Sequence, residues 1–170
     1  MKKMLLTIVT MMLLGALMCS CNGNGKTATN TAIPNPMVES SYAEIKAKFE
    51  IDLPLLNGAK NVKYFIIEGT SLAEAQFKIG GSKYSFRGTR KDLNDPQSIA
   101  GVYYDFPKTE KFAYDGCEVT IWYGGGKGAG LCATWRRAFD RYSLYSSDLK
   151  DTDIEAFTLT VKALIDKQYR

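Results

Sequence analysis

The sequence contains no histidine. Imidazole is the commonest general base at neutral pH, a usual member of catalytic triads and a frequent metal ligand. No cluster of other metal-ligating residues replaces it, so we expect neither a metal site nor a cofactor. This absence favours a non-enzymatic protein.

The sequence also lacks a strong excess of charge. Its 22 basic residues include Lys2 and Lys3, which belong to a predicted export signal, so 20 basic and 18 acidic residues remain afterwards, a formal charge of +2. The basic residues are dispersed along the chain. This pattern lacks the electrostatic footprint of a polyanion-binding protein and argues against nucleic acid as a partner.

The N-terminus has the features of a bacterial export signal. Lys2 and Lys3 form a positive start, and the fifteen residues from Met4 to Met18 are uncharged. Such a run has the length of a signal core and is shorter than the roughly 20 residues of a membrane-spanning helix. We therefore predict that residues 1–20 are a signal peptide.

The residues that follow resemble the lipobox of bacterial lipoproteins. Met18, Cys19 and Ser20 supply one bulky and two small residues before Cys21. The resemblance implies that Cys21 becomes the first residue and carries palmitate-type acyl chains, which anchor a protein stably in a membrane. The alternative is an ordinary secretory signal cleaved nearby.

Between Cys21 and the folded part lies a stretch rich in Asn, Thr and Gly. It has too little apolar mass to fold, so residues 21–37 are interpreted as the lipidated cysteine with a flexible tether, and residues 38–170 as one domain. Asn22 is not the aspartate that retains lipoproteins in the inner membrane. We expect a cell-envelope location, in the outer membrane facing the periplasm if the host is Gram-negative.

Periodic patterns predict the elements of the domain. Helical spacing predicts a helix over 41–49, and alternation predicts strands over 73–79 and 82–87 joined at Gly80-Gly81. Asp115-Gly116 predicts a second two-residue turn. Further strands are expected over these segments: 62–67, 112–114, 119–123, 131–136 and 142–146. Apart from this count, the long connection 89–110 is interpreted as hiding a short strand at 101–106.

The last predicted element is a helix whose apolar stripe includes Ile154, Phe157 and Val161. Thr152 and Glu155 have the spacing of a capping box before it. Together these elements predict an α+β fold, in which an antiparallel sheet of six or seven strands has N- and C-terminal helices packed on one face.

Four segments resemble an uncharacterised family of extracytoplasmic domains of gut bacteria. They are Leu53–Ile67, Gly101–Phe106, Cys117–Trp135 and Tyr142–Leu149. Their motifs concern packing and turns. The resemblance therefore implies an envelope location and a fold, and no activity.

Two cysteines and a glycine-rich segment invite sharper interpretations. Cys117 and Cys132 could form a disulfide in an oxidising compartment, although alternation places them on opposite faces of a hairpin unless a bulge shifts the register. Residues 124–130 are rich in glycine, but their lysine lacks the helix that a phosphate-binding loop opens, so a hairpin loop is favoured.

Acidic residues suggest two further sites. Asp148, Asp151 and Asp153 lack calcium-loop spacing, and interaction with a helix N-terminus explains them. The set Asp105, Glu110, Asp115 and Glu118 could supply paired carboxylates for a small envelope hydrolase, which is the alternative function; solvated turns explain the set equally.

Aromatic and arginine residues in the middle of the domain form the candidate binding surface, because both types are enriched where proteins bind partners. A pocket beside Tyr104, Trp122 and Arg136 would support it. Burial beneath helices is the alternative. The partner would be an envelope protein, a glycan or a peptide, bound by a non-enzymatic binding or accessory module. The six candidate residues are Tyr103, Tyr104, Trp122, Tyr123, Arg136 and Arg137.

Overall fold

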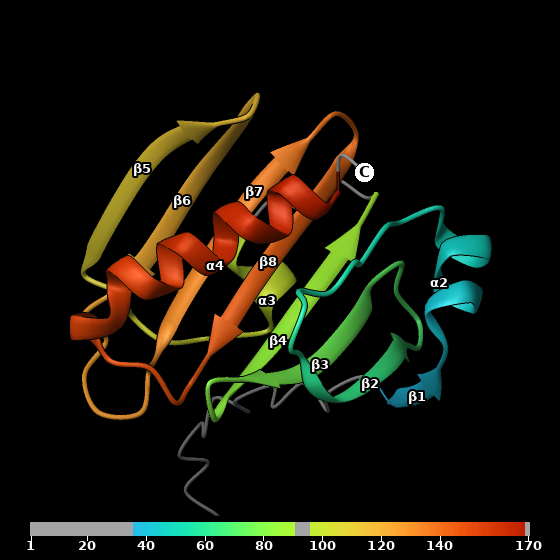
Figure 1. The fold of residues 1–170 in the computed structure, drawn as a ribbon, viewed down its shortest axis with the longest axis horizontal. Helices are drawn as coiled ribbons and strands as arrows, with labels where there is room; N and C mark the ends of the chain where they lie inside the picture. The colour runs from blue at the N-terminus through green and yellow to red at the C-terminus, as the bar shows by residue number, and fades with distance from the viewer. Residues whose placement is uncertain (1–35, 91–95, 169–170) are drawn as a thin grey trace, which may run out of the picture. The chain divides into compact units, whose positions relative to one another are not determined.

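The computed structural model describes residues 36–90 and 96–168. They form one antiparallel sheet of eight strands in the order β1-β2-β3-β4-β8-β7-β6-β5 (Figure 1). The predicted signal peptide, Cys21 and nearly all of the tether lie outside these residues. The strands are β1 (Met37–Ser40), β2 (Lys60–Ile67), β3 (Ala73–Ile79), β4 (Ser82–Thr89), β5 (Lys108–Tyr114), β6 (Cys117–Tyr123), β7 (Leu131–Arg137) and β8 (Asp140–Ser146).

The predicted antiparallel sheet with a C-terminal helix is confirmed, whereas the predicted count of six or seven strands is wrong. The tether was expected to include Met37, but β1 begins there and pairs with β2. Gly101–Phe106 was expected to be a strand and is not one. Its Val102 and Phe106 are buried against the sheet, so packing explains their apolar character without strand pairing.

Two tight turns set the register of the hairpins. Gly80 and Gly81 both have positive φ, and so do Asp115 and Gly116. Two successive residues of this kind make the turn whose twist matches that of the strands on either side. The β3–β4 turn thereby places Lys78 directly opposite Lys83.

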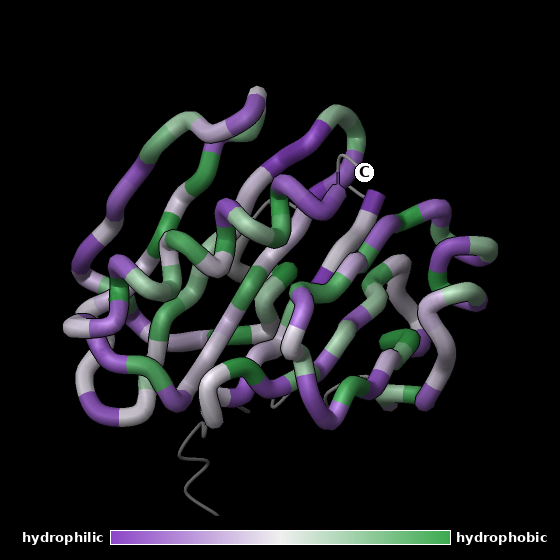
Figure 2. The backbone as a smooth tube through the Cα atoms, viewed as in Figure 1, coloured by the Kyte–Doolittle hydropathy of each residue, from purple (hydrophilic) through white to green (hydrophobic). Residues whose placement is uncertain are grey.

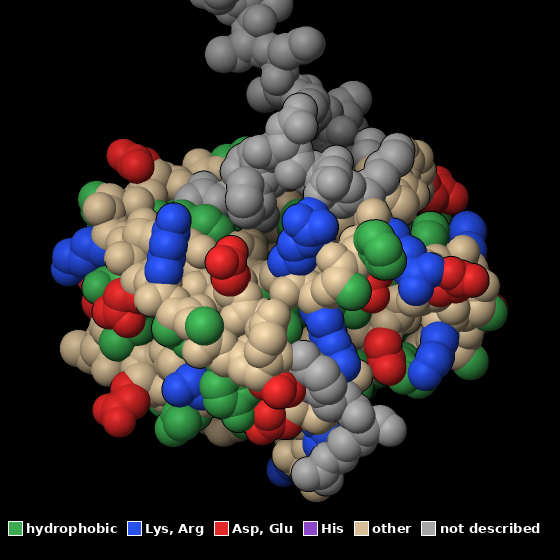
Figure 3. All heavy atoms as spheres, turned by 90° about the horizontal axis from the view of Figure 1, so that it is seen from above, with side chains coloured by type: hydrophobic (Ala, Val, Ile, Leu, Met, Phe, Trp, Pro, Cys, Tyr) green, Lys and Arg blue, Asp and Glu red, His purple; other side chains and the backbone are tan. Residues whose placement is uncertain are grey.

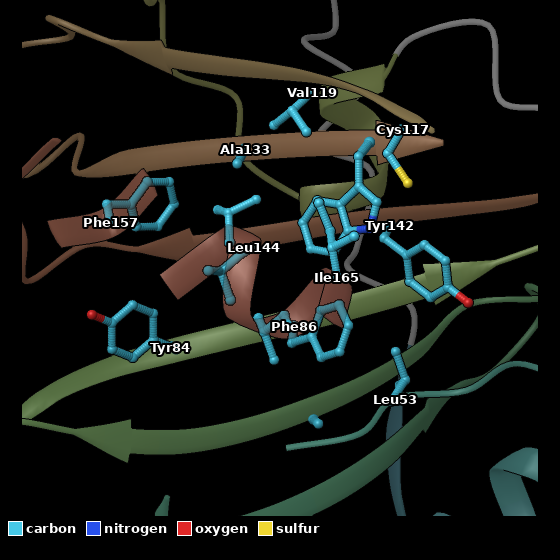
Figure 4. Close-up of a cluster of buried hydrophobic side chains, with 14 of the residues drawn as sticks. Leu53, Tyr84, Phe86, Cys117, Val119, Ala133, Tyr142, Leu144, Phe157 and Ile165 are labelled. Atoms are coloured by element: carbon cyan, nitrogen blue, oxygen red, sulfur yellow. The ribbon is translucent and has the colours of Figure 1, made fainter. Parts of the chain in front are cut away.

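The main core lies between one face of the sheet and α4 (Ile154–Lys167). Phe157, Val161 and Ile165 of α4 are fully buried, and Figure 4 shows Phe157 and Ile165 among the side chains of the central strands. Hydrophobic and polar residues alternate along these strands (Figure 2), so one face of the sheet is apolar. Lys150 N–H donates to the Asp153 carboxylate (2.8 Å) ahead of α4, so the observed cap begins two residues before the predicted Thr152.

A shorter helix, α2 (Tyr42–Phe49), follows β1. Ser41 accepts the N–H of Glu44 (3.2 Å), and the Glu44 carboxylate accepts the N–H of Ser41 (2.9 Å). These paired bonds satisfy donors that the first turn of a helix leaves unused. α2 contributes Ile45 to the main core.

The opposite face of the sheet is more polar and carries α3 (Pro96–Ala100) and the residues after it. A small apolar cluster there includes Ala100, Val102 and Cys132. Beside it lies an ion pair between Glu74 and Arg87, whose side chains are 2% and 17% exposed. Arg87 also donates to the Ile99 carbonyl (3.4 Å), which ties α3 to the sheet. Among the described residues, none of the helices has the length and apolarity needed to cross a membrane.

Candidate functional site

The structure divides the predicted aromatic and arginine surface between the two faces of the sheet. Tyr103 and Tyr104 are 90% and 45% exposed in the loop after α3, and Trp122 packs against the small cluster on the polar face. Tyr123 packs against the main core instead and donates its hydroxyl to Glu110 (3.0 Å). Trp122 and Tyr123 lie on different faces because adjacent strand residues point in opposite directions.

The two predicted arginines separate for the same reason. Arg136 lies opposite Glu118 and Arg141 in the strand ladder, whereas Arg137 is its neighbour along β7. Consecutive residues of a strand alternate between faces. The two guanidinium groups therefore do not act together on one ligand.

Cys117 and Cys132 are both buried on opposite faces, Cys117 in the main core and Cys132 in the small cluster. The register places Trp122, five residues beyond Cys117, opposite Cys132. That offset corresponds to roughly 17 Å along a strand, far beyond the 4.4–6.8 Å between Cα atoms that a disulfide spans. The disulfide suggested for this pair is therefore wrong, and the alternation that argued against it explains why.

The other sites suggested by the sequence do not assemble. The glycine-rich residues 124–130 connect β6 to β7 and open no helix. Asp151 accepts the N–H of Gly124 (3.0 Å) and pairs with Lys108 (3.6 Å), so its role is in the loop. Glu110 lies opposite the core residue Ile121, whereas Glu118 is exposed on the other face. No group of three metal-ligating side chains occurs within residues 36–90 and 96–168.

Lysines gather at one corner of the polar face, beside the turn between β3 and β4. Lys60 pairs with Lys78 across β2 and β3, and Lys78 pairs with Lys83 across β3 and β4. Lys63 joins them one step further along β2, where a bulge shifts the register. Partners across a ladder share a face, so the four lysine side chains leave the same face of three neighbouring strands. We call Lys60, Lys63, Lys78 and Lys83 the lysine corner.

This concentration of like charge has little compensation from acidic side chains. Lys63 pairs with Glu39 (3.8 Å). In the described part of the chain, Lys60, Lys78 and Lys83 form no ion pair, and the nearby Asp148 accepts the backbone N–H of Lys83. Like charges placed directly opposite destabilise a sheet. In the view of Figure 3, basic and acidic side chains are interspersed.

A cavity of about 460 Å³ opens beside the lysine corner. None of the six predicted binding residues lines it, and no carboxylate does. Its lining combines ammonium groups with neutral hydroxyl and amide groups and with aromatic rings. The lining residues are Asn61, Lys63, Gln76, Phe77, Lys78, Lys83, Tyr84, Ser85, Tyr145, Ser146 and Ser147.

The buried ion pair positions one of these polar groups. Gln76 Nε2 donates to Glu74 Oε1 (2.7 Å), and the other oxygen of Glu74 accepts from Arg87. These bonds fix the position of the Gln76 amide group on the polar face of the sheet. Its carbonyl oxygen then remains available as an acceptor in the cavity lining.

Two serines of the lining have unsatisfied hydroxyls. Ser85 Oγ and Ser146 Oγ are buried and have no hydrogen-bond partner among the described residues, and Ser146 is only 1% exposed. A buried polar atom without a partner costs about 1–3 kcal/mol. Ser85 lies on the polar face, in register with Gln76 and Tyr145, whereas Ser146 lies opposite the core residue Leu131.

Tyr145 completes the lining as a hydrogen-bond donor. Burial, followed by the neighbouring Tyr104, raises the pKa of Tyr145 to about 12. The phenol therefore keeps its proton at neutral pH. With the lysines, it makes the cavity rich in donors, which suits a negatively charged ligand that also carries hydroxyl groups.

Sequence reasoning missed this site because the lysines are dispersed along the chain and meet only after folding. One signal was present: the two-residue turn at Gly80-Gly81 implies that Lys78 faces Lys83.

Comparisons of the chain with known protein families, with curated proteins and with solved structures found no match.

Proposed function

We propose that this protein is a lipid-anchored module of the bacterial cell envelope that binds an anionic ligand without chemical conversion. The observation that carries the proposal is the row of facing lysines beside a cavity lined without carboxylates. Such a site can attract and hold negative charge. It lacks the pair of acid and base groups that hydrolysis would need.

An anionic ligand would supply negative charge at the lysine corner, where acidic side chains provide little of it. Charge-assisted hydrogen bonds from ammonium groups to a carboxylate, sulfate or phosphate are stronger than neutral ones. Binding would also relieve the repulsion between Lys78 and Lys83, which lie directly opposite each other. The lysine corner therefore gains more from an anion than isolated surface lysines do.

Replacing both facing lysines tests this site. We expect Lys78→Gln with Lys83→Gln to weaken binding of citrate, used as a trivalent probe at low ionic strength, by at least about tenfold, since each charged hydrogen bond contributes about 1.5 kcal/mol or more. Isothermal titration calorimetry of the purified protein measures the change.

The matched control removes two exposed lysines elsewhere, Lys48→Gln with Lys111→Gln, which lowers the net charge equally. Its citrate affinity should stay within about threefold of the wild type. Equal losses in both variants would show that citrate responds to net charge alone, and the site would be rejected.

The envelope location rests on Cys21 and the signal before it, which lie outside the described residues. We expect the protein to incorporate a palmitate probe in its host, and Cys21→Ala to abolish that label, because the acyl chains attach to this sulfur and to the new N-terminus. Cys19→Ala is the control and should keep the label. Undiminished label on Cys21→Ala would contradict lipid anchoring.

A further inference from the structure

The spacing of charges at the lysine corner indicates the shape of the ligand. Lys60, Lys78 and Lys83 occupy facing positions on β2, β3 and β4. Neighbouring strands lie about 4.8 Å apart, so the row presents one ammonium group per strand at regular intervals. We infer that the ligand is a linear acidic oligosaccharide whose successive sugar units place their carboxylates along this row. The inference rests on the proposed function and specifies its ligand.

The neutral part of the lining distinguishes a sugar from a simple polyanion. Asn61, Gln76 and Ser147 carry side-chain groups that both donate and accept, as sugar hydroxyls do. Ser85, on the same face as Gln76, adds a buried hydroxyl that has no partner among the described residues. A ligand made only of anionic oxygens would use the donors and leave the acceptors unused. A hydroxyl-rich acidic ligand satisfies both kinds of group.

The surroundings allow a ligand longer than one sugar. A second cavity of about 500 Å³ lies along the glycine-rich loop and shares Ser147 with the first. Lys127 and Lys150 line it together with Asp148 and Asp151, whose carboxylates accept the backbone N–H groups of Lys83 and Gly124. A chain that leaves the lysine corner past Ser147 would therefore meet further donors. Affinity should increase with ligand length.

The test compares galacturonate oligomers of one, three and six units with their methyl esters, which have the same sugar rings and no charge. Titration calorimetry on the purified protein should show at least tenfold tighter binding of the trimer than of the monomer. Binding should be lost on esterification, and Lys78→Gln with Lys83→Gln should lower trimer affinity at least tenfold. Ser85→Ala should lower trimer affinity about threefold.

Other results would overturn the inference in distinguishable ways. If citrate binds through Lys78 and Lys83 but the trimer binds no tighter than citrate, the acidic glycan is rejected and the anion site remains. If a single-stranded oligonucleotide of equal charge binds more tightly than the hexamer, the ligand is a nucleic acid and the inference is wrong. If no anion depends on these lysines, the inference and the proposed function both fail.

Discussion

Glu74→Gln is expected to lower the free energy of unfolding by about 3–5 kcal/mol, the loss typical of a buried ion pair that loses one partner. Glu74 is 1% exposed and accepts hydrogen bonds from Arg87 and Gln76. The substitution leaves the Arg87 guanidinium largely buried without a counter-charge. Urea unfolding of the purified protein measures the difference.

A double substitution separates the charge from the packing. Glu74→Leu with Arg87→Met removes both charges and keeps apolar volume, and replacements of this kind are often close to neutral. We expect it to recover at least half of the stability that Glu74→Gln loses. The recovery should be incomplete because Arg87 also donates to Ile99. If the double variant is less stable than Glu74→Gln, the loss comes from packing and the account of the ion pair is wrong.

Gly130→Ala is expected to lower the free energy of unfolding by about 3 kcal/mol or more. Gly130 has φ +71°, and an added Cβ would overlap the carbonyl oxygen of Ser146. Left-handed backbone costs a residue with a Cβ about 1–2 kcal/mol, and the overlap adds the cost of moving β8 away from the loop. Because Ser146 lines the cavity, citrate binding should weaken as well.

The matched control is Gly126→Ala in the same loop. Gly126 has φ +84°, and an added Cβ would meet nothing within 4 Å. The Gly126→Ala substitution adds backbone strain without the overlap, so it should lower the free energy of unfolding by only about 1–2 kcal/mol. Thermal or urea unfolding of both variants gives the comparison. Equal losses of unfolding free energy in the two variants would mean that the overlap with Ser146 adds nothing to the effect of Gly130→Ala.

Local patterns predicted the parts of the fold that local chemistry controls. Gly80-Gly81 and Asp115-Gly116 adopt the positive φ values that their turn type requires, and the hairpins around them form as expected. The apolar stripe of α4 is buried from Phe157 to Ile165, and Ile154 is partly buried. Each of these features depends on residues that are close in sequence. Periodicity and turn chemistry were therefore sufficient.

Features that depend on distant partners were predicted poorly. β1 consists of four residues without a clear alternation, and it is a strand only because β2 offers it an edge. Gly101–Phe106 has the residue types of a strand, but it buries Val102 and Phe106 as a loop. Strand preference reflects packing on a sheet surface more than an intrinsic backbone tendency.

The candidate site also depends on residues that are distant in sequence. The turn at Gly80-Gly81 was enough to predict that Lys78 faces Lys83. Lys60 joins them through a bulge near Asn61, which has a positive φ of 53°. Ser85 meets Tyr145 through the pairing of β4 with β8, which are more than fifty residues apart in sequence. A single sequence contains no signal for either arrangement, so the cavity could not be predicted.

The most direct test of the account is to map the bound ligand by nuclear magnetic resonance. Trigalacturonate would be titrated into isotope-labelled protein, and the amide signals that shift would be assigned. The account predicts the largest shifts at Lys60, Lys78, Lys83 and Ser85, around the lysine corner. Largest shifts at Tyr103 and Trp122, with the lysine corner unchanged, would contradict it.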